Sequence, residues 1–342
     1  MSKFCCPSCK GVLTEETSAL VCTACNVEYP LQDGLPCFSQ TEKYFGEYSK
    51  REMEAMIEFA KQSGWRNALD ESAKGQKEFV KDLVLDDRRG NFTRLVNLNG
   101  SERVLDIGCG FGGVSLQLAK QVKEVFSLDA SFHRVSFLNI ASQQDKITNI
   151  FPACHEDVVN LPYADEYFDL ISLVGVFEYI PLSYSQFSTR EAHNVFLREL
   201  YRVLKPGGVL YLGTKNRFGW QYLAGGLDHN GIRFGPVLPR LVADAISRVA
   251  HHKPYRIIVY SHREYKKLLA MARFGDLEFY WPYPGYQHPA AMVSMDKAFD
   301  IDDKQIATVI GPGFKQRALA LLGRLGLLRY IVPHYSIVAK KF

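Results

Sequence analysis

The sequence lacks any long apolar run, and this absence limits the kind of protein it encodes. No stretch of about 18 or more apolar residues occurs in the 342-residue chain, so no membrane-spanning helix is expected. The first ten residues, MSKFCCPSCK, lack the apolar core of a secretory signal. Internal repeats and low-complexity tracts are also missing. These absences favour a globular, cytoplasmic protein.

The chain also has little net charge, +4, but this charge is unevenly distributed. Residues 1–38 carry a net charge of −2, whereas residues 231–273 hold nine Lys and Arg against two Asp and Glu, a net charge of +7. A local excess of positive charge attracts anionic molecules. The segment therefore predicts an anionic ligand or partner.

Cysteine is not abundant, but four of the eight cysteines are regularly spaced. Two C-x2-C pairs are separated by twelve residues, and the four thiols are Cys6, Cys9, Cys22 and Cys25. Four thiolates at this spacing suit a tetrahedral zinc ion with no open coordination position, so the metal would be structural. Cys5 is an alternative to Cys6. Because this ribbon is acidic, we interpret it as a packing or partner module rather than one that grips phosphates.

Residues 101–215 alternate short apolar runs with amphipathic stretches, the pattern of a parallel sheet with crossover helices. The predicted strands are residues 103–107, 124–129, 150–152, 168–174, 209–215, 277–283 and 335–340. The predicted helices include residues 191–204, 261–272 and 311–328. Residues 39–100 are polar, with apolar residues at helical spacing, and predict a helical linker and cap.

A glycine-rich turn follows the first of these strands. Gly108, Gly110 and Gly112 allow the backbone to turn sharply and approach a ligand. The spacing of Gly108, Gly110 and Gly113 also satisfies the dinucleotide fingerprint, but Asp106, two residues before the first glycine, would repel a pyrophosphate. A carboxylate there tolerates the sulfonium and amino groups of S-adenosylmethionine (SAM). Asp129, 23 residues later, ends the next strand and could accept ribose hydroxyls.

Four blocks together resemble the class I SAM-dependent methyltransferases, of the methyltransferase type 11-like kind, over roughly residues 90–215. They are residues 104–112 (VLDIGCGFG), 128–130 (LDA), 157–163 (DVVNLPY) with 168–170 (FDL), and 200–208 (LYRVLKPGG). The resemblance implies an α/β fold with a Rossmann-like, seven-stranded, mostly parallel sheet and helices on both faces. A small zinc ribbon (1–38), the helical linker and cap (39–100) and the methyltransferase domain (101–342) with a substrate-side insertion (216–262) would follow one another.

The resemblance also implies which residues bind SAM. Asp106 and the glycine loop would hold the methionine end, Asp129 the ribose and Asp157 the adenine, while Val174 would line the floor near the sulfonium. The full implied set is Asp106, Gly108, Cys109, Gly110, Phe111, Gly112, Asp129, Ala130, Glu156, Asp157 and Val174. Two simpler interpretations stay open: the loop as a plain strand-to-helix turn, and Asp157 as a helix N-cap or loop carboxylate.

The acceptor side is less clearly marked. Glu178-Tyr179 stands where many relatives have Glu-His, and tyrosine is no base at neutral pH without a large pKa shift. Glu178 could orient or deprotonate the acceptor, or simply interact with a helix dipole. Asn216 and Arg217 leave the fifth strand and could bind acceptor oxygens, or lie in a solvated loop. His229 is a candidate base, with a structural role as the alternative.

Two further segments are compatible with more than one role. The aromatic run at residues 280–286 could stack on a sugar or base, or end a strand in a rigid turn. Residues 317–330 could lie on a membrane surface or cover the sheet as a helix. The sequence predicts methyl transfer to an oxygen, less readily a nitrogen, of an anionic small molecule or saccharide conjugate. The alternatives are an RNA methyltransferase and a non-catalytic SAM-fold scaffold.

Overall fold

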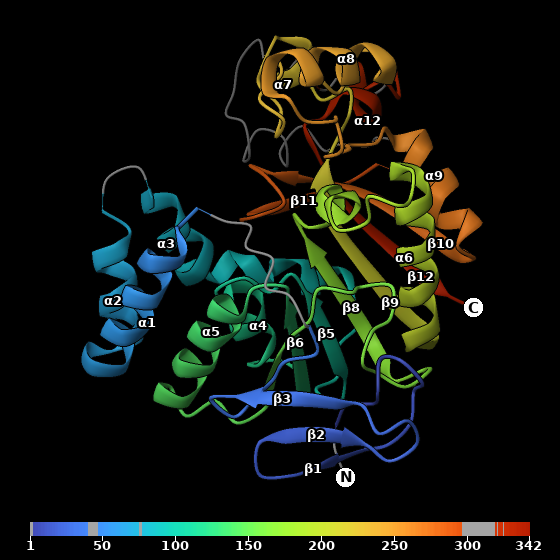
Figure 1. Cartoon of the computed structure of the whole chain (residues 1–342). Helices are drawn as coiled ribbons and strands as arrows, with labels where there is room; N and C mark the ends of the chain where they lie inside the picture. The colour runs from blue at the N-terminus through green and yellow to red at the C-terminus, as the bar shows by residue number, and fades with distance from the viewer. Residues whose placement is uncertain (1–2, 40–46, 75–76, 296–318, 320, 324) are drawn as a thin grey trace. The chain divides into compact units, whose positions relative to one another are not determined.

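The computed structural model describes residues 3–39, 47–74, 77–295, 319, 321–323 and 325–342 (Figure 1). The chain divides into two compact units. Unit 1 comprises Met1–Ser172 and Glu199–Val209, and unit 2 comprises Leu173–Arg198 and Leu210–Phe342. This division differs from the predicted one, whose domain boundaries stay a prediction. Among the described residues, no helix has the length and apolar character needed to cross a bilayer.

Unit 1 begins with the ribbon and a helical segment. The ribbon is a four-stranded antiparallel sheet of β1 (Leu13–Glu15), β2 (Ala19–Cys22), β3 (Glu28–Gln32) and β4 (Leu35–Pro36). The helices that follow are α1 (Lys50–Ser63), α2 (Trp65–Ser72), α3 (Glu78–Leu85) and the 3-10 helix η2 (Asp87–Leu95). A capping box fixes the start of α1, because Ser49 and Glu52 each accept a backbone N–H from the other.

The remainder of unit 1 is a sheet with helices. Its strands are β5 (Arg103–Ile107), β6 (Glu124–Asp129), β7 (Ile150–Cys154) and the unit 1 parts of β8 (Phe168–Val174) and β9 (Leu204–Lys215). They follow the order β9-β8-β5-β6-β7, and β5, β6 and β7 are parallel. The helices are α4 (Gly113–Leu118) and α5 (Phe132–Gln144). The inner strands are apolar and buried, which fits a sheet that is covered on its faces.

Unit 2 holds the remaining strands and the insertion. Strand β10 (Phe274–Tyr283) pairs antiparallel with β11 (Ala291–Ser294) and β12 (His334–Lys341), in the order β11-β10-β12-β9-β8. The helical elements are η3 (Phe177–Leu182), α7 (Trp220–Leu223), α8 (Arg240–His251), α9 (His262–Met271) and α12 (Leu328–Ile331). Helix α6 (Thr189–Val203) is divided between the two units.

The α/β fold is confirmed, with three differences in detail. Strands 103–107, 124–129 and 168–174 lie where the sequence predicts them. The sheet has eight strands rather than seven, because β11 adds to the edge of β10. The predicted helix 191–204 is confirmed as α6, which ends at Val203, whereas β9 begins directly at Leu204, five residues before the predicted strand 209–215. The predicted helix at 311–328 falls largely outside the described residues, and only its last part can be compared with the structure.

Candidate functional site

The glycine loop after β5 is held in a conformation that glycine favours. Gly108, Gly110 and Gly112 have φ values of 70°, 55° and 94°. At Gly112 a Cβ atom would lie 2.3 Å from Cδ1 of Leu138, so the loop packs tightly against α5 there. At Gly110 a Cβ atom would meet nothing within 4 Å. The backbone at Gly110 is therefore open to an approaching ligand.

Asp106 lies at the buried end of this loop. It is 2% exposed, and its two oxygens accept hydrogen bonds from the hydroxyls of Ser115 (2.7 Å) and Ser172 (2.8 Å). Burial raises the pKa of Asp106 to about 6, although the two serine hydroxyls lower it. A carboxylate so desolvated gains from a cation nearby, such as the amino group of a methionine moiety.

Asp129, at the end of β6, ties the loop in place. One carboxylate oxygen accepts the Gly110 N–H at 2.9 Å, and the other accepts the Ser131 N–H, also at 2.9 Å. Each carboxylate oxygen has a second lone pair, so both can still accept a hydrogen bond from a ligand hydroxyl. The structure thus brings Asp129 to the open position at Gly110, as the cofactor prediction requires.

The roles of the other residues of the predicted SAM set stay predictions. Cys109 and Phe111 are buried in the loop, and Ala130 follows Asp129. Asp157 accepts from the Asn160 side chain (2.7 Å) and from the Val159 N–H (3.3 Å), so it also shapes its own turn. Glu156 is half-buried beside it. Val174, half-buried at the end of β8, belongs to unit 2.

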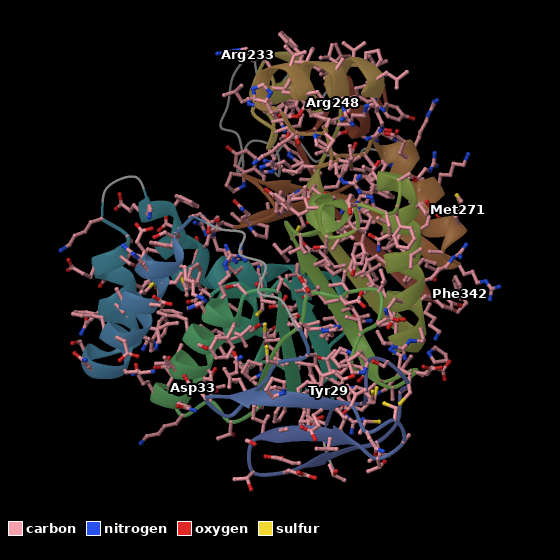
Figure 2. The ribbon with its side chains drawn as sticks, viewed as in Figure 1. Tyr29, Asp33, Arg233, Arg248, Met271 and Phe342 are labelled. Carbon is pink, nitrogen blue, oxygen red and sulfur yellow. The ribbon has the colours of Figure 1, made fainter. Side chains whose placement is uncertain are left out.

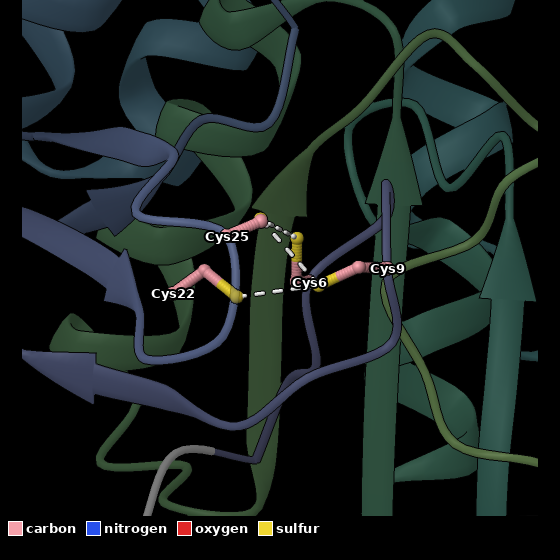
Figure 3. A group of neighbouring side chains, drawn as sticks. All are labelled: Cys6, Cys9, Cys22 and Cys25. Atoms are coloured by element: carbon pink, nitrogen blue, oxygen red, sulfur yellow. Dashed lines mark hydrogen bonds between the residues drawn. The ribbon is translucent and has the colours of Figure 1, made fainter.

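The four cysteines of the ribbon converge as predicted (Figure 3). Their sulfur atoms all lie within 4.8 Å of one another, with contacts of 3.4 to 3.6 Å between pairs. A tetrahedron of sulfurs about 2.3 Å from zinc has edges of roughly 3.8 Å, so the arrangement fits the ion. Cys6 belongs to the group and Cys5 does not, which settles the choice between them.

The ribbon packs against the rest of unit 1. The Cys5 N–H donates to the Pro162 carbonyl (2.9 Å), and Lys10 Nζ donates to the Leu161 carbonyl (3.0 Å). Phe4 lies against the rings of Phe38, Phe126 and Tyr163. These contacts agree with the packing role that its acidic composition favours.

Glu178 is one of two predicted catalytic residues that are fully buried, the other being Asn216. Glu178 is 0% exposed, and its Oε1 accepts from the Thr214 hydroxyl (2.7 Å) and the Lys215 N–H (3.1 Å). Its Oε2 has no hydrogen-bond partner among the residues that the structure describes. A buried carboxylate oxygen without a partner is unusual, and at such a position a water or ligand is expected to donate to it.

The neighbouring Tyr179 is joined to a histidine from the insertion. The Tyr179 hydroxyl and Nδ1 of His229 lie 2.9 Å apart. Burial, followed by the nearby charge of Lys215, lowers the pKa of His229 to about 4, so the imidazole is neutral at pH 7. The sequence left the base in doubt because Tyr179 replaces a histidine. The fold brings an imidazole to that tyrosine from 50 residues away.

Lys215 is a functional candidate that the sequence analysis did not single out. It is half-buried and forms no ion pair with a described residue, and desolvation lowers its pKa. The charges of Glu178 and Asp228 act on it. Its position at the end of β9 is the only signal that could have indicated it.

The side-chain N–H groups of Asn216 and Arg217 bond to other parts of the protein, so both residues have structural roles. The Asn216 amide donates to the carbonyls of Tyr330 (2.9 Å) and Val332 (2.7 Å) and is fully buried. The Arg217 guanidinium donates to the carbonyls of Pro236 and Leu238 and to Glu264. These contacts hold the loop that follows β9. The geometry thus gives no support to the prediction that the two residues bind the acceptor.

The aromatic run also occupies a defined place. The Tyr286 ring packs against two glycines. A Cβ atom added to Gly175 would lie 3.2 Å from the ring, and one added to Gly213 would lie 3.3 Å from it. The neighbouring His334 ring is 5.2 Å away between centroids. Small residues at the ends of β8 and β9 therefore make room for this tyrosine.

Comparison with known proteins identifies two parts of the chain. Residues 105–212 match the family described as methyltransferase domain, and residues 4–34 match the Trm112p-like protein family. The chain thus carries a methyltransferase domain of the class it resembles, preceded by a cysteine ribbon, and both predictions are confirmed. The domain supports SAM as the cofactor, and the four clustered cysteines support zinc as the metal.

Two of the individual relatives each match less than half of the chain. The ubiquinone/menaquinone biosynthesis C-methyltransferase of Neisseria gonorrhoeae (strain NCCP11945) is 31% identical over 150 residues, 43% of this chain and 56% of that protein. The demethylmenaquinone methyltransferase of Oceanobacillus iheyensis is 28% identical over 167 residues, 47% of this chain and 55% of that protein. The chain therefore spans little more than half the length of these relatives.

Solved structures give similar but distant matches. The [4+2]-cyclase SpnF has a TM-score of 0.45 and 21% identity, covering 75% of this chain and 80% of that one. Phosphoethanolamine N-methyltransferase 2 of Haemonchus contortus has a TM-score of 0.48 and 15% identity, covering 86% and 60%. At this distance the matches carry no information about the reaction.

Proposed function

We propose that this protein transfers the methyl group of SAM to an oxygen of an anionic small molecule or saccharide conjugate. The observation that carries the proposal is the open backbone at Gly110, where a Cβ atom would meet nothing within 4 Å, next to the carboxylate of Asp129. Buried Asp106 belongs to the same loop. These two carboxylates suit a cationic, phosphate-free nucleoside better than a dinucleotide, whose phosphates they would repel.

The acceptor would be bound by unit 2. Lys215 offers a half-buried positive charge that forms no ion pair within the described part of the chain, which suits a carboxylate or phosphate on the acceptor. Glu178 holds the end of β9 through Thr214 and the Lys215 N–H. In this proposal Glu178 and Lys215 position the acceptor, and His229 is the base.

The proposed chemical step balances as follows. The acceptor oxygen forms a bond to the methyl carbon, the bond from that carbon to sulfur breaks, and S-adenosylhomocysteine leaves. The hydroxyl proton passes to Nε2 of His229, while Nδ1–H donates to the Tyr179 oxygen and fixes the ring. The His229 imidazole is neutral at pH 7, since burial and the charge of Lys215 lower its pKa to about 4, so its Nε2 can accept a proton.

The relatives favour a second candidate, methylation of carbon. The Neisseria gonorrhoeae protein is named as a C-methyltransferase of ubiquinone and menaquinone biosynthesis, and it is 31% identical over 150 residues. A phenolic acceptor would use the same base: removal of its hydroxyl proton gives a phenolate, an ortho ring carbon of which attacks the methyl group, and the proton on that carbon is then lost to restore the aromatic ring. Locating the new methyl group in the product by NMR separates the two candidates.

The test uses the full chain, calorimetry with SAM and methyl-tritiated SAM. We expect the protein to bind SAM and to transfer the tritiated methyl group to hydroxyl compounds that bear a carboxylate or phosphate. Lys215→Met should lower the rate of this transfer and leave the affinity for SAM unchanged. Lys205→Met, whose lysine pairs with Asp169, is the control. Failure to bind SAM would support a scaffold. Label in RNA, with retention that falls steeply as salt is raised, would support an RNA methyltransferase.

A further inference from the structure

Helix α8 exposes the side chains that a helix normally buries. Its buried residues are the small Ala243 and Ser247, one turn apart. Its large aliphatic residues face solvent, with Leu241 87% and Val249 81% exposed. An amphipathic helix of a globular protein usually turns its apolar stripe inward. Here the stripe is formed by Leu241, Val242, Ile246 and Val249 and is exposed.

The turn before α8 adds apolar residues to this stripe. Leu227 is 61% exposed, and Phe234 is exposed while its φ of 60° lies in the left-handed region, which bulky residues avoid. Residues held in such a conformation cluster at functional sites. The Phe234 ring lies over Gly225, where a Cβ atom would meet it at 3.0 Å, and Phe234 is still 45% exposed.

Hydrogen bonds fix this turn to the helix. Asp228 accepts from the Tyr255 hydroxyl (2.7 Å), and the Tyr255 N–H donates to Asp244 of α8 (2.9 Å). Asp228 also accepts the backbone N–H groups of Asn230 (2.9 Å) and Ile232 (2.8 Å), which shapes the turn. The turn and the helix are therefore one local structure, called here the α8 face: Leu227, Phe234, Leu241, Val242, Ile246 and Val249.

The border of the α8 face is basic. Arg233 and Arg248, labelled in Figure 2, are exposed, as are Lys253 and two histidines at the helix end. Between residues 227 and 263 the acidic residues are Asp228, which accepts hydrogen bonds within the turn, and Asp244, which pairs with Arg248 at 2.7 Å. Apolar side chains beside arginine and lysine match the two layers of an anionic lipid surface, acyl chains beneath negatively charged headgroups.

We propose that the α8 face docks on the surface of an anionic phospholipid bilayer, with the apolar side chains among the acyl chains and the basic border at the headgroups. A nucleic acid would use the positive charge but leave the aliphatic residues in water. The proposal concerns where the protein acts and does not depend on the methyl-transfer reaction.

The experiment is sedimentation of the full chain with vesicles, without SAM. We expect binding to phosphatidylcholine vesicles containing about 30% phosphatidylglycerol, weaker binding to phosphatidylcholine alone, and a loss on raising salt. The double variant Leu241→Gln/Val249→Gln should lower the partition coefficient at least about tenfold. The control Met271→Gln/Phe342→Gln changes two exposed apolar residues outside the face and should bind as the wild type does.

Two outcomes would overturn the proposal. The first is equal vesicle binding by the wild type and the α8 variant, or none by either. The second is a wild-type dimer in light scattering that the α8 variant converts to monomers, because the face would then be an interface between copies. Circular dichroism of the same variants checks that they are folded, and calorimetry with SAM tests cofactor binding separately. Since that measurement is independent of lipid, failure of vesicle binding is distinct from failure of the proposed reaction.

Discussion

The Tyr179 hydroxyl lies 2.9 Å from Nδ1 of His229, a contact between the segment after β8 and the basic insertion. We expect His229→Ala to lower the methyl-transfer rate at least about 100-fold, since a positioned base contributes this much. The SAM dissociation constant should stay within about twofold, and Tyr179→Phe should cause a smaller loss and shift the pH profile. His252→Ala changes an exposed histidine and serves as the control. Full activity of His229→Ala would remove His229 as the base.

Asp129 carries the prediction for the ribose. Asp129→Ala should weaken SAM binding at least about tenfold in calorimetry, because both the ligand hydrogen bonds and the hold on Gly110 are lost. Asp165→Ala, which removes an exposed partner of Arg202, is the control and should bind SAM normally. An unchanged affinity for Asp129→Ala would exclude this residue from the site.

SAM binding should depend on pH through Asp106. Burial raises the pKa of Asp106 to about 6, so the free carboxyl is mostly charged above pH 6 and mostly neutral below it. A neutral carboxyl attracts the cationic amino group less, so the dissociation constant should rise by up to about tenfold from pH 6 to pH 5. Asp106→Asn should bind SAM weakly without this dependence. If the native protein shows no change over this range, Asp106 does not hold the charged end of SAM.

Two glycines of one loop should respond differently to alanine. At Gly112, a Cβ atom would lie 2.3 Å from Leu138, and φ is 94°, so Gly112→Ala should destabilise the fold by about 2 kcal/mol or more in urea unfolding. At Gly110 the space is open, and Gly110→Ala should cost about 1 kcal/mol from its positive φ while weakening SAM binding. Equal destabilisation by both would contradict the tight packing against α5.

The ribbon should contain one zinc ion. Elemental analysis is expected to give about one zinc per chain, and Cys22→Ser should lose the metal and destabilise the ribbon. Cys5→Ser is a matched control, because Cys5 lies next to a ligand but outside the sulfur cluster, and it should keep its zinc. A metal-free protein with a folded ribbon would refute the site.

The sequence by itself determined the strands and the loop of the cofactor half. The apolar runs at 103–107, 124–129 and 168–174 are bounded by glycine or charged residues, so each is a strand in its own local context. The glycine spacing and the two aspartates follow one another along the chain, and the structure places Asp129 at Gly110. The four cysteines form their cluster because two tight knuckles are encoded locally.

Only the tertiary structure decided the acceptor side. The partners of Asn216 are carbonyl groups of Tyr330 and Val332, more than 100 residues away, and no sequence pattern marks a carbonyl as available. The meeting of Tyr179 with His229 likewise depends on how the insertion folds back. Sequence periodicity also does not predict that the aliphatic residues of α8 are exposed. It shows that a helix has an apolar and a polar face, but not which face other side chains cover.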